Sequence, residues 1–361
     1  MIRGETRRTT GLRDWMTPLL LSLYLVPLPG LGAHGIPFIL VLWLLTDPRL
    51  CIRVVEVLIY FGLVAMGFLM ILIQPDKFSF LISLMLVVLI SRLLEILPRD
   101  WSLIPALWLH LGAAMVSLMT LVALGYDLAP MTLYGESRHA IHQNAFLTFR
   151  ISGLYLEPST MGLHMLLMSI WANHSHPDKR WVAMLYSGMS LVTFSSVTIL
   201  AAFKIAHDLL LRLRSKAGIL LIPVVILGSG MVLQPFYLFF TDKLALYNAD
   251  GLENAKRFEA LVFTLDMIGL GEFNLFLGHK VEVIQRYVFY DLGPVISTPM
   301  ILGLGGVLLI LVFLARMRWS LLNIAIVMAT KATINNPLLW VATSRRRKLR
   351  TSAASTPPDG A

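Results

Sequence analysis

Long apolar segments follow one another along almost the whole chain, and short clusters of charged residues separate them. A helix of roughly 20 apolar residues crosses the hydrocarbon core of a bilayer, and shorter ones occur inside bundles. Because 57% of the residues are hydrophobic, only 14% are charged and the mean hydropathy is +0.74, a soluble domain of this length is excluded. The sequence therefore predicts an all-α, polytopic transmembrane helical bundle.

Eleven apolar segments are predicted spans, and an irregular region near the C-terminus gives a total of 11 to 12. Residues 181–211 are too long for one crossing and short for two, which predicts a hairpin broken near residues 194–196. Residues 338–344 are too short to return across a bilayer, which predicts a broken or re-entrant pair around residues 335–337. The predicted spans are 16–32, 36–45, 54–74, 78–97, 103–126, 155–172, 181–195, 197–211, 218–240, 292–314 and 319–334.

The positive charge of the chain predicts its orientation rather than a nucleic-acid partner. The net charge is +9, but Lys and Arg form short clusters between apolar runs, which is the pattern that orients membrane proteins. With the N-terminus in the cytoplasm, 21 of the 30 Lys and Arg lie on the cytoplasmic side and 9 outside. Most of those nine fall in two predicted external segments, about 127–154 and 241–291. Positive charge on the outside works against the positive-inside rule, so we expect these residues to have a function there.

One integral membrane domain is predicted for residues 1–349, followed by a disordered polar tail at 350–361. The single cysteine, Cys51, excludes an intramolecular disulfide and a cysteine-based metal cluster. The motifs GxxxxGK[ST], GxGxxG, HExxH and DxD are missing from the sequence. Neither ATP nor a metal-bound sugar nucleotide is therefore expected, and no cofactor is predicted.

Basic residues in the two external segments suit an anionic ligand. An arginine offers a planar fork that matches phosphate oxygens, and a lysine offers a mobile point charge. For each of these residues the alternative is a pair with a lipid headgroup or a nearby acid. The candidates to clamp a diphosphate are Arg138, Arg150, Arg257, Lys280 and Arg286.

The second external segment also contains apolar residues at helical spacing, which predicts an amphipathic helix at the outer membrane–water boundary. These residues are Phe258, Leu261, Val262, Leu265 and Ile268.

Glu157 and Pro158 stand where a loop becomes a helix. Proline at the first helical position, with an acid beside it, is a good helix start in its own right. The functional interpretation is that the Glu157 carboxylate, near Arg150, orients or deprotonates a hydroxyl nucleophile. Gly153 would let the backbone approach a ligand closely.

Ionisable residues inside the apolar runs are functional candidates by default. For His110 and His164 we favour hydrogen bonds between helices. Arg92 and Glu95, three residues apart, are expected to pair near the cytoplasmic boundary.

The string from Phe149 to Ser159, of the form FRxSGLYxEPS, resembles the signature that opens a central helix in O-antigen and exopolysaccharide polymerases of the Wzy type. LVTFSSVTILAA at 191–202 resembles the serine-bearing helix of that family, and NAKRFEALVFTLDMI resembles its arginine-bearing loop. NLFLGHK and the glycine-rich GPVISTPMILGLGGVLLIL follow in the family's order. The resemblance covers roughly residues 140–315.

This resemblance implies a metal-independent, inverting glycosyltransferase of the GT-C type. Such an enzyme polymerises undecaprenyl diphosphate-linked oligosaccharides at the periplasmic face of the bacterial inner membrane. The family histidine before the glycine-rich helix is missing from RYVFYDLGP, so His279 in the GHK turn is a weaker equivalent. The predicted catalytic residues are Arg150, Glu157 and Arg257, and the predicted substrate-binding residues are Arg138, Gly153, Pro158, His279, Lys280 and Arg286.

Three other functions stay open at this point. An O-antigen ligase would use lipid A core as the acceptor, a flippase or other transporter would carry lipid-linked oligosaccharides, and a scaffold would have no catalytic residues. The expected partners are the lipid-linked oligosaccharide, membrane lipids, and the chain-length regulator and flippase of the same pathway.

Overall fold

The computed structural model describes thirteen stretches of the chain, all of them helices or the connections between helices. No β-strand occurs in these stretches. They are residues 11–26, 35–50, 52, 54–97, 101–124, 151–155, 157–193, 195, 197–212, 256–271, 274–286, 293–329 and 332–344. In chain order the helices are α1 (Leu12–Ser22), α2 (Gly35–Leu45), α3 (Val54–Ile73), η1 (Pro75–Lys77), α4 (Phe78–Ile96), α5 (Ile104–Leu124), α7 (Pro158–Ser175), α8 (Arg180–Leu191), α9 (Thr198–Arg212), α12 (Lys256–Gly269), α13 (Val281–Arg286), α14 (Pro294–Arg316), α15 (Leu321–Ala329) and α16 (Pro337–Thr343).

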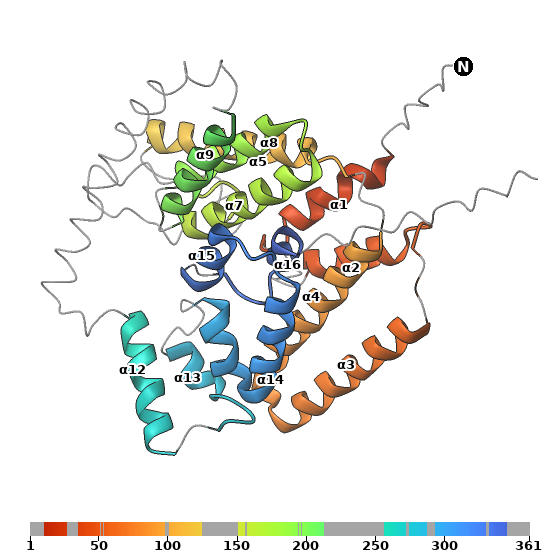
Figure 1. Ribbon diagram of the computed structural model, residues 1–361, viewed down its shortest axis with the longest axis vertical. Helices are drawn as coiled ribbons and strands as arrows, with labels where there is room; N and C mark the ends of the chain where they lie inside the picture. The colour runs from red at the N-terminus through yellow and green to blue at the C-terminus, as the bar shows by residue number, and fades with distance from the viewer. Residues whose placement is uncertain are drawn as a thin grey trace, which may run out of the picture.

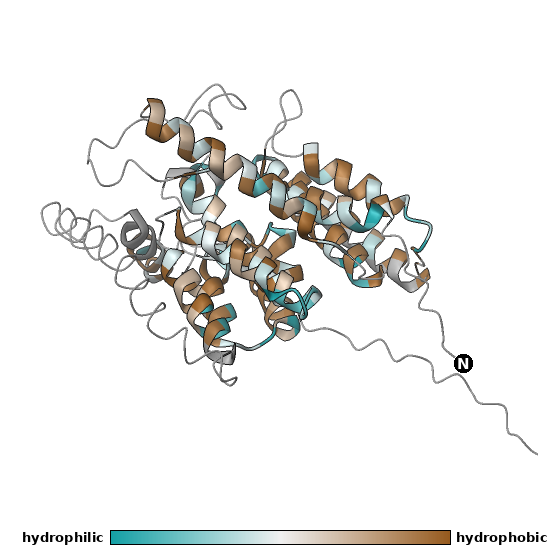
Figure 2. Ribbon diagram, turned by 90° about the horizontal axis from the view of Figure 1, so that it is seen from above, coloured by the Kyte–Doolittle hydropathy of each residue, from teal (hydrophilic) through white to brown (hydrophobic). Residues whose placement is uncertain are grey.

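Three of these helices are long and apolar enough to cross a membrane: η1 with α4, α5, and α14. Their outward-facing side chains are also apolar, for example Trp108 on α5 at 61% exposure and Leu308 on α14 at 57%. Figure 2 shows hydrophobic residues along most of the helices. Because water would not tolerate such a surface, it indicates membrane association. The count of 11 to 12 spans and the GT-C-like arrangement stay predictions, and the predicted span 218–240 lies outside the described residues.

Helix α7 is the centre of the bundle. Every residue from Met161 to Ala172 is buried, which is the pattern of a helix surrounded on all sides. It packs most extensively against α8, and also against α9 and α16 (Figure 1).

The helices form two ends of opposite character. One end, which we call the ionic end, gathers charged residues from the start of α1 and from the ends of α2, α4 and α14. The other end, the loop end, is where α4 begins at Phe78 and α7 begins at Pro158. Since α7 has 18 residues, these ends are roughly 27 Å apart. The residues of the ionic end are Arg13, Asp14, Asp47, Arg49, Arg92, Glu95 and Arg316.

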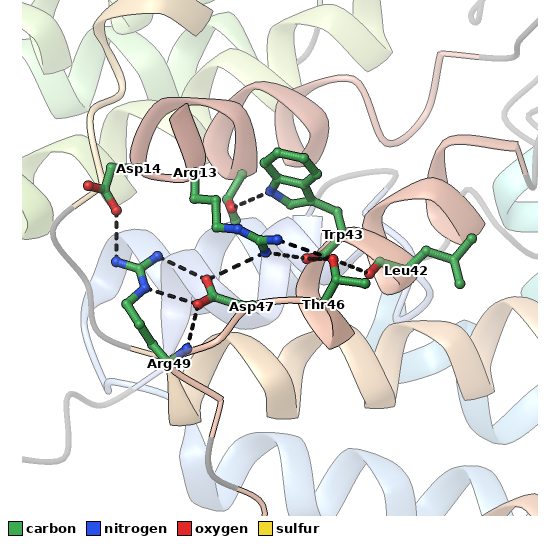
Figure 3. Close-up of polar contacts among 8 residues, drawn as sticks. Arg13, Asp14, Leu42, Trp43, Thr46, Asp47 and Arg49 are labelled. Carbon is green, nitrogen blue, oxygen red and sulfur yellow. Dashed lines mark hydrogen bonds and ion pairs between the residues drawn. The ribbon is translucent and has the colours of Figure 1, made fainter. Parts of the chain in front are cut away.

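An ion cluster at the ionic end joins α1 to the segment after α2 (Figure 3). Arg49 donates to Asp14 at 2.8 Å and to both carboxylate oxygens of Asp47 at 3.0 and 2.9 Å. Arg13 donates to the Trp43 carbonyl at 3.0 Å and lies 4.8 Å above the Trp43 ring. Burial raises the pKa of Asp47, but the hydrogen bonds and charge of Arg49 outweigh burial and hold that pKa below its ordinary value.

A second cluster ties α4 to α14. Glu95 accepts hydrogen bonds from Arg92 at 2.9 Å and from Arg316. The pair of Arg92 and Glu95 expected from their spacing is therefore confirmed, and the sequence did not foresee its extension to Arg316.

Two irregular regions have the form that the sequence predicted. Helix α8 ends at Leu191 and α9 begins at Thr198, so the hairpin breaks at the expected serines. Helices α15 and α16 have only 9 and 7 residues, about 14 and 10 Å of helix. The start of α15 and the end of α16 both lie at the ionic end, because the backbone N–H of Arg318, just before α15, donates to the carbonyl of Thr343, the last residue of α16, at 2.7 Å. They form the broken pair expected around residues 335–337, where the Asn336 side chain accepts from the Leu338 N–H at 3.0 Å.

Replacing Asp47 with Asn removes the charge that Arg13 and Arg49 share, and should lower the free energy of unfolding by about 2 kcal/mol. Because the folded-state pKa of Asp47 is lowered from 3.8, its contribution is present above that pH and is lost as the pH falls through the folded pKa. Thermal unfolding in detergent should therefore separate wild type from Asp47→Asn at neutral pH, and the difference should shrink as the pH falls through the folded-state pKa. Asp178→Asn, at an exposed aspartate, should match wild type throughout. Equal midpoints for wild type and Asp47→Asn at neutral pH would contradict this role.

Candidate functional site

The segment before α7 is a buried loop rather than a surface connection. Ile151, Ser152 and Tyr155 are only 3%, 3% and 1% exposed. Non-helical backbone at membrane depth persists only where protein surrounds it and satisfies its polar groups. This segment, residues 151–155 and Glu157, enters the bundle between α1, α5 and α7, and we call it the entry loop.

Gly153 meets two requirements of the entry loop. Its φ of +54° lies in the left-handed region, where a side chain is strained. A Cβ atom there would also lie 3.2 Å from the Met161 sulfur. The Gly153 N–H donates to the Ser117 hydroxyl of α5 at 3.1 Å, which satisfies a buried donor. The close backbone approach expected of Gly153 is therefore made to the protein's own helices.

Tyr155 holds the entry loop in the bundle. Its hydroxyl donates to the Ser22 carbonyl of α1 at 2.7 Å. Its ring lies between two imidazoles, with ring centroids 5.8 Å from His110 and 5.1 Å from His164. Neither ring nitrogen of His164 makes a hydrogen bond within the described part of the chain. The interpretation of His164 as an interhelical hydrogen-bonding residue is therefore wrong, because its ring packs on an aromatic face instead.

Glu157 precedes the first turn of α7 in an extended conformation, with φ −134° and ψ 138°. Its carbonyl accepts from the N–H groups of Thr160 and Met161, both at 3.1 Å, and Pro158 occupies the first helical turn. The Glu157 carboxylate makes no capping bond to a helix N–H and instead accepts from the Ser159 hydroxyl at 3.1 Å. The start of the helix therefore depends on Pro158, and the partly exposed carboxylate is not needed as a cap.

Hydroxyl groups at the break between α8 and α9 face the same end of α7. Ser190 donates to the Gly162 carbonyl at 2.8 Å, and the Thr193 and Ser195 hydroxyls lie 3.1 Å apart. A Cβ atom at Gly162 would lie 2.6 Å from the Thr193 oxygen and 2.9 Å from the Ser195 oxygen. The serine-bearing segment singled out in the sequence thus packs on the helix that Glu157 opens.

His279 and Lys280 lie elsewhere, in a segment at 274–280 that rests on α14. The His279 N–H donates to the Met300 carbonyl at 2.8 Å, and its ring centroid is 5.7 Å from that of Phe263 on α12. Burial lowers the pKa of His279, and the neighbouring Lys77 ammonium lowers it further. Lys280 is exposed at the start of α13.

The predicted site residues therefore fall into separate groups. Gly153, Glu157 and Pro158 share the entry loop, whereas His279 and Lys280 lie beside α12 and α13, which Figure 1 shows well away from α7. Arg257 belongs to α12 and Arg286 ends α13, but the positions of these two side chains, and both Arg138 and Arg150, lie outside the described residues. The convergence of Arg150 and Arg257 on one ligand stays a prediction.

Two residues with evident roles were not predicted from the sequence. Tyr155 stood inside the signature string without a role, and no spacing rule would have paired it with two distant histidines. Lys77 flanks an apolar run, where a lysine ordinarily reaches toward water. Within the described residues, no group of three His, Cys, Asp or Glu side chains could hold a metal ion, and no cofactor was predicted.

Comparisons with known protein families, with curated proteins and with solved structures each found no match to this chain.

Gly162→Ala should push α7 away from the α8–α9 break and lower the free energy of unfolding by about 1–3 kcal/mol. Gly188→Ala is the matched control, since among the described residues no atom would lie within 4 Å of the added carbon. That control should leave stability unchanged or raise it by up to about 1 kcal/mol. Thermal unfolding of the purified variants in detergent measures the difference. If both variants unfold at the same temperature, the close packing of α7 on the hydroxyl groups is wrong.

Proposed function

We propose that this chain is a bacterial polysaccharide polymerase that joins undecaprenyl diphosphate-linked oligosaccharides into a surface polysaccharide. The observation that carries the proposal is the Glu157 carboxylate, which stands at the start of the central helix α7 and makes no capping bond. The signature-like order of residues before α7, with Gly153 at a positive φ, supports the same function. The resemblance in the order of motifs supplies the reaction.

In the proposed reaction a hydroxyl of the acceptor sugar attacks the anomeric carbon of the donor. The new carbon–oxygen bond forms while the bond from that carbon to the diphosphate breaks, and configuration inverts. Glu157 accepts the proton of the attacking hydroxyl. Arg150 and Arg257 stabilise the charge that develops on the diphosphate, worth on the order of 3 kcal/mol for one well-placed donor.

The proposed orientation places the ionic end in the cytoplasm and the loop end at the periplasmic face. Its support is the gathering of charged side chains at the ionic end, which matches the positive-inside pattern of the sequence. Glu157 then lies at the face where the lipid-linked donor is presented. Helix α12, whose exposed Leu265 and Ile268 are apolar, lies at the outer boundary in this arrangement.

The lipid-linked intermediates of cells that lack the protein test this proposal. A polymerase predicts the accumulation of single lipid-linked repeats on the outer face, because export continues while polymerisation stops. Single repeats trapped on the inner face would favour a flippase instead. Long polymer that is made but not attached to lipid A core would favour a ligase.

Site variants test the assigned roles in the same cells. Glu157→Gln is expected to lower the rate of polymer formation by about 10²–10⁴-fold, and Arg150→Ala and Arg257→Ala by about 10²-fold or more. Asp178→Asn and Lys179→Ala, both at exposed positions near the ionic end, are charge-matched controls and should make normal polymer. Long polymer from the Arg150→Ala and Arg257→Ala variants at normal membrane levels would show that the two arginines do not bind the diphosphate.

A further inference from the structure

Helix α14 is interrupted inside its apolar sequence. Gly303 has φ 58° and ψ −135°, which no residue of a continuous helix adopts. A Cβ atom at Gly306 would lie 2.3 Å from the Thr298 carbonyl oxygen. In a straight helix, Thr298 and Gly306 would lie about 12 Å apart along the axis. The two halves of α14 therefore fold sharply against each other. The break leaves carbonyls near Gly303 without their usual helical donors.

The segment at 274–280 occupies this break through its backbone. The Leu304 N–H donates to the Leu275 carbonyl at 2.7 Å, and the His279 N–H donates to the Met300 carbonyl at 2.8 Å. A Cβ atom at Gly278 would lie 2.6 Å from the Ile301 carbonyl, so only glycine allows the approach. The segment and the break therefore fit together as one docked unit.

Lys77 contacts both parts of that docked unit. It directly precedes α4, is only 1% exposed, and donates from its ammonium to the Leu277 carbonyl at 2.6 Å and to the Ile301 carbonyl at 2.5 Å. Burial of an ammonium group is costly unless its hydrogen bonds are satisfied, and carbonyls freed by a helix break carry partial negative charge. The two carbonyls belong to the docked segment and to α14, so this one cation bridges both to α4.

We propose that Lys77 is a positioning residue that docks the segment at 274–280 onto the membrane helices. This inference rests on the proposed function in one respect: the docked segment carries His279 and Lys280 and continues into α13, so docking sets where the predicted substrate-binding residues stand. Lys77 acts through backbone carbonyls and does not contact the substrate. Another link that holds the segment in the break, such as a disulfide, should therefore replace Lys77 in the reaction.

Disulfide cross-linking measures docking without any assay of activity. In a Cys51→Ser background, Leu275→Cys and Leu304→Cys place two thiols on residues joined by a backbone hydrogen bond, where Cα atoms lie about 5–6 Å apart and within disulfide range. In membranes treated with a mild oxidant, Lys77→Met should slow cross-link formation about tenfold, because the carbonyls lose a charged donor. Lys77→Arg should retain part of the rate. Lys179→Met, at an exposed lysine, should leave it unchanged.

Activity then separates positioning from direct chemistry. Lys77→Met should lower polymer formation, the oxidised cysteine pair should restore it, and reduction of the disulfide should abolish the restored activity. Cross-linking of Lys77→Met at the wild-type rate would overturn the docking role. A cross-linked Lys77→Met protein that stays inactive would show that Lys77 acts on the substrate itself. If the wild-type chain makes no polymer, the proposed function fails, while the cross-linking rates still decide whether Lys77 docks the segment.

Discussion

Backbone hydrogen bonding inside an apolar bundle is the constraint on which the rest of this structure depends. Wherever the chain leaves a helix at membrane depth, its N–H and C=O groups lose their helical partners and meet no water. Three of the places where the described chain leaves its helices are the entry loop, the α8–α9 break and the break inside α14. At each one, side-chain hydrogen bonds satisfy part of the exposed backbone or tie the segment to a neighbouring helix.

The partners differ in kind. The entry loop is held by the Ser117 hydroxyl and by the Tyr155 hydroxyl, both neutral groups. The α8–α9 break is held by its own Ser and Thr hydroxyls, packed against the glycine of a neighbouring helix. Only the α14 break is held by a full charge, that of Lys77. The α14 break therefore combines one charged side-chain contact with the backbone hydrogen bonds of the segment at 274–280.

The sequence predicted the helical class, the break near residues 194–196, the broken pair around residues 335–337 and the pair of Arg92 and Glu95. Each of these follows from local information, such as segment length, proline position or spacing on one helix. The contacts of Tyr155 and Lys77 join residues that are distant in the sequence, as with Lys77 and Ile301, 224 residues apart. The helical spacing of residues along one segment cannot predict such a contact between distant segments. The same limit applies to the candidate site. Local patterns identified Gly153, Glu157 and Pro158, but only the structure shows that they lie far from His279.

The short helices α15 and α16 return the chain to the end of the bundle at which α1 begins. Gly11 lies at the ionic end, where α1 begins, and Ser344 lies there too, because it pairs with Met317 directly after α14. Two positions near opposite ends of the described chain therefore share one end of the bundle.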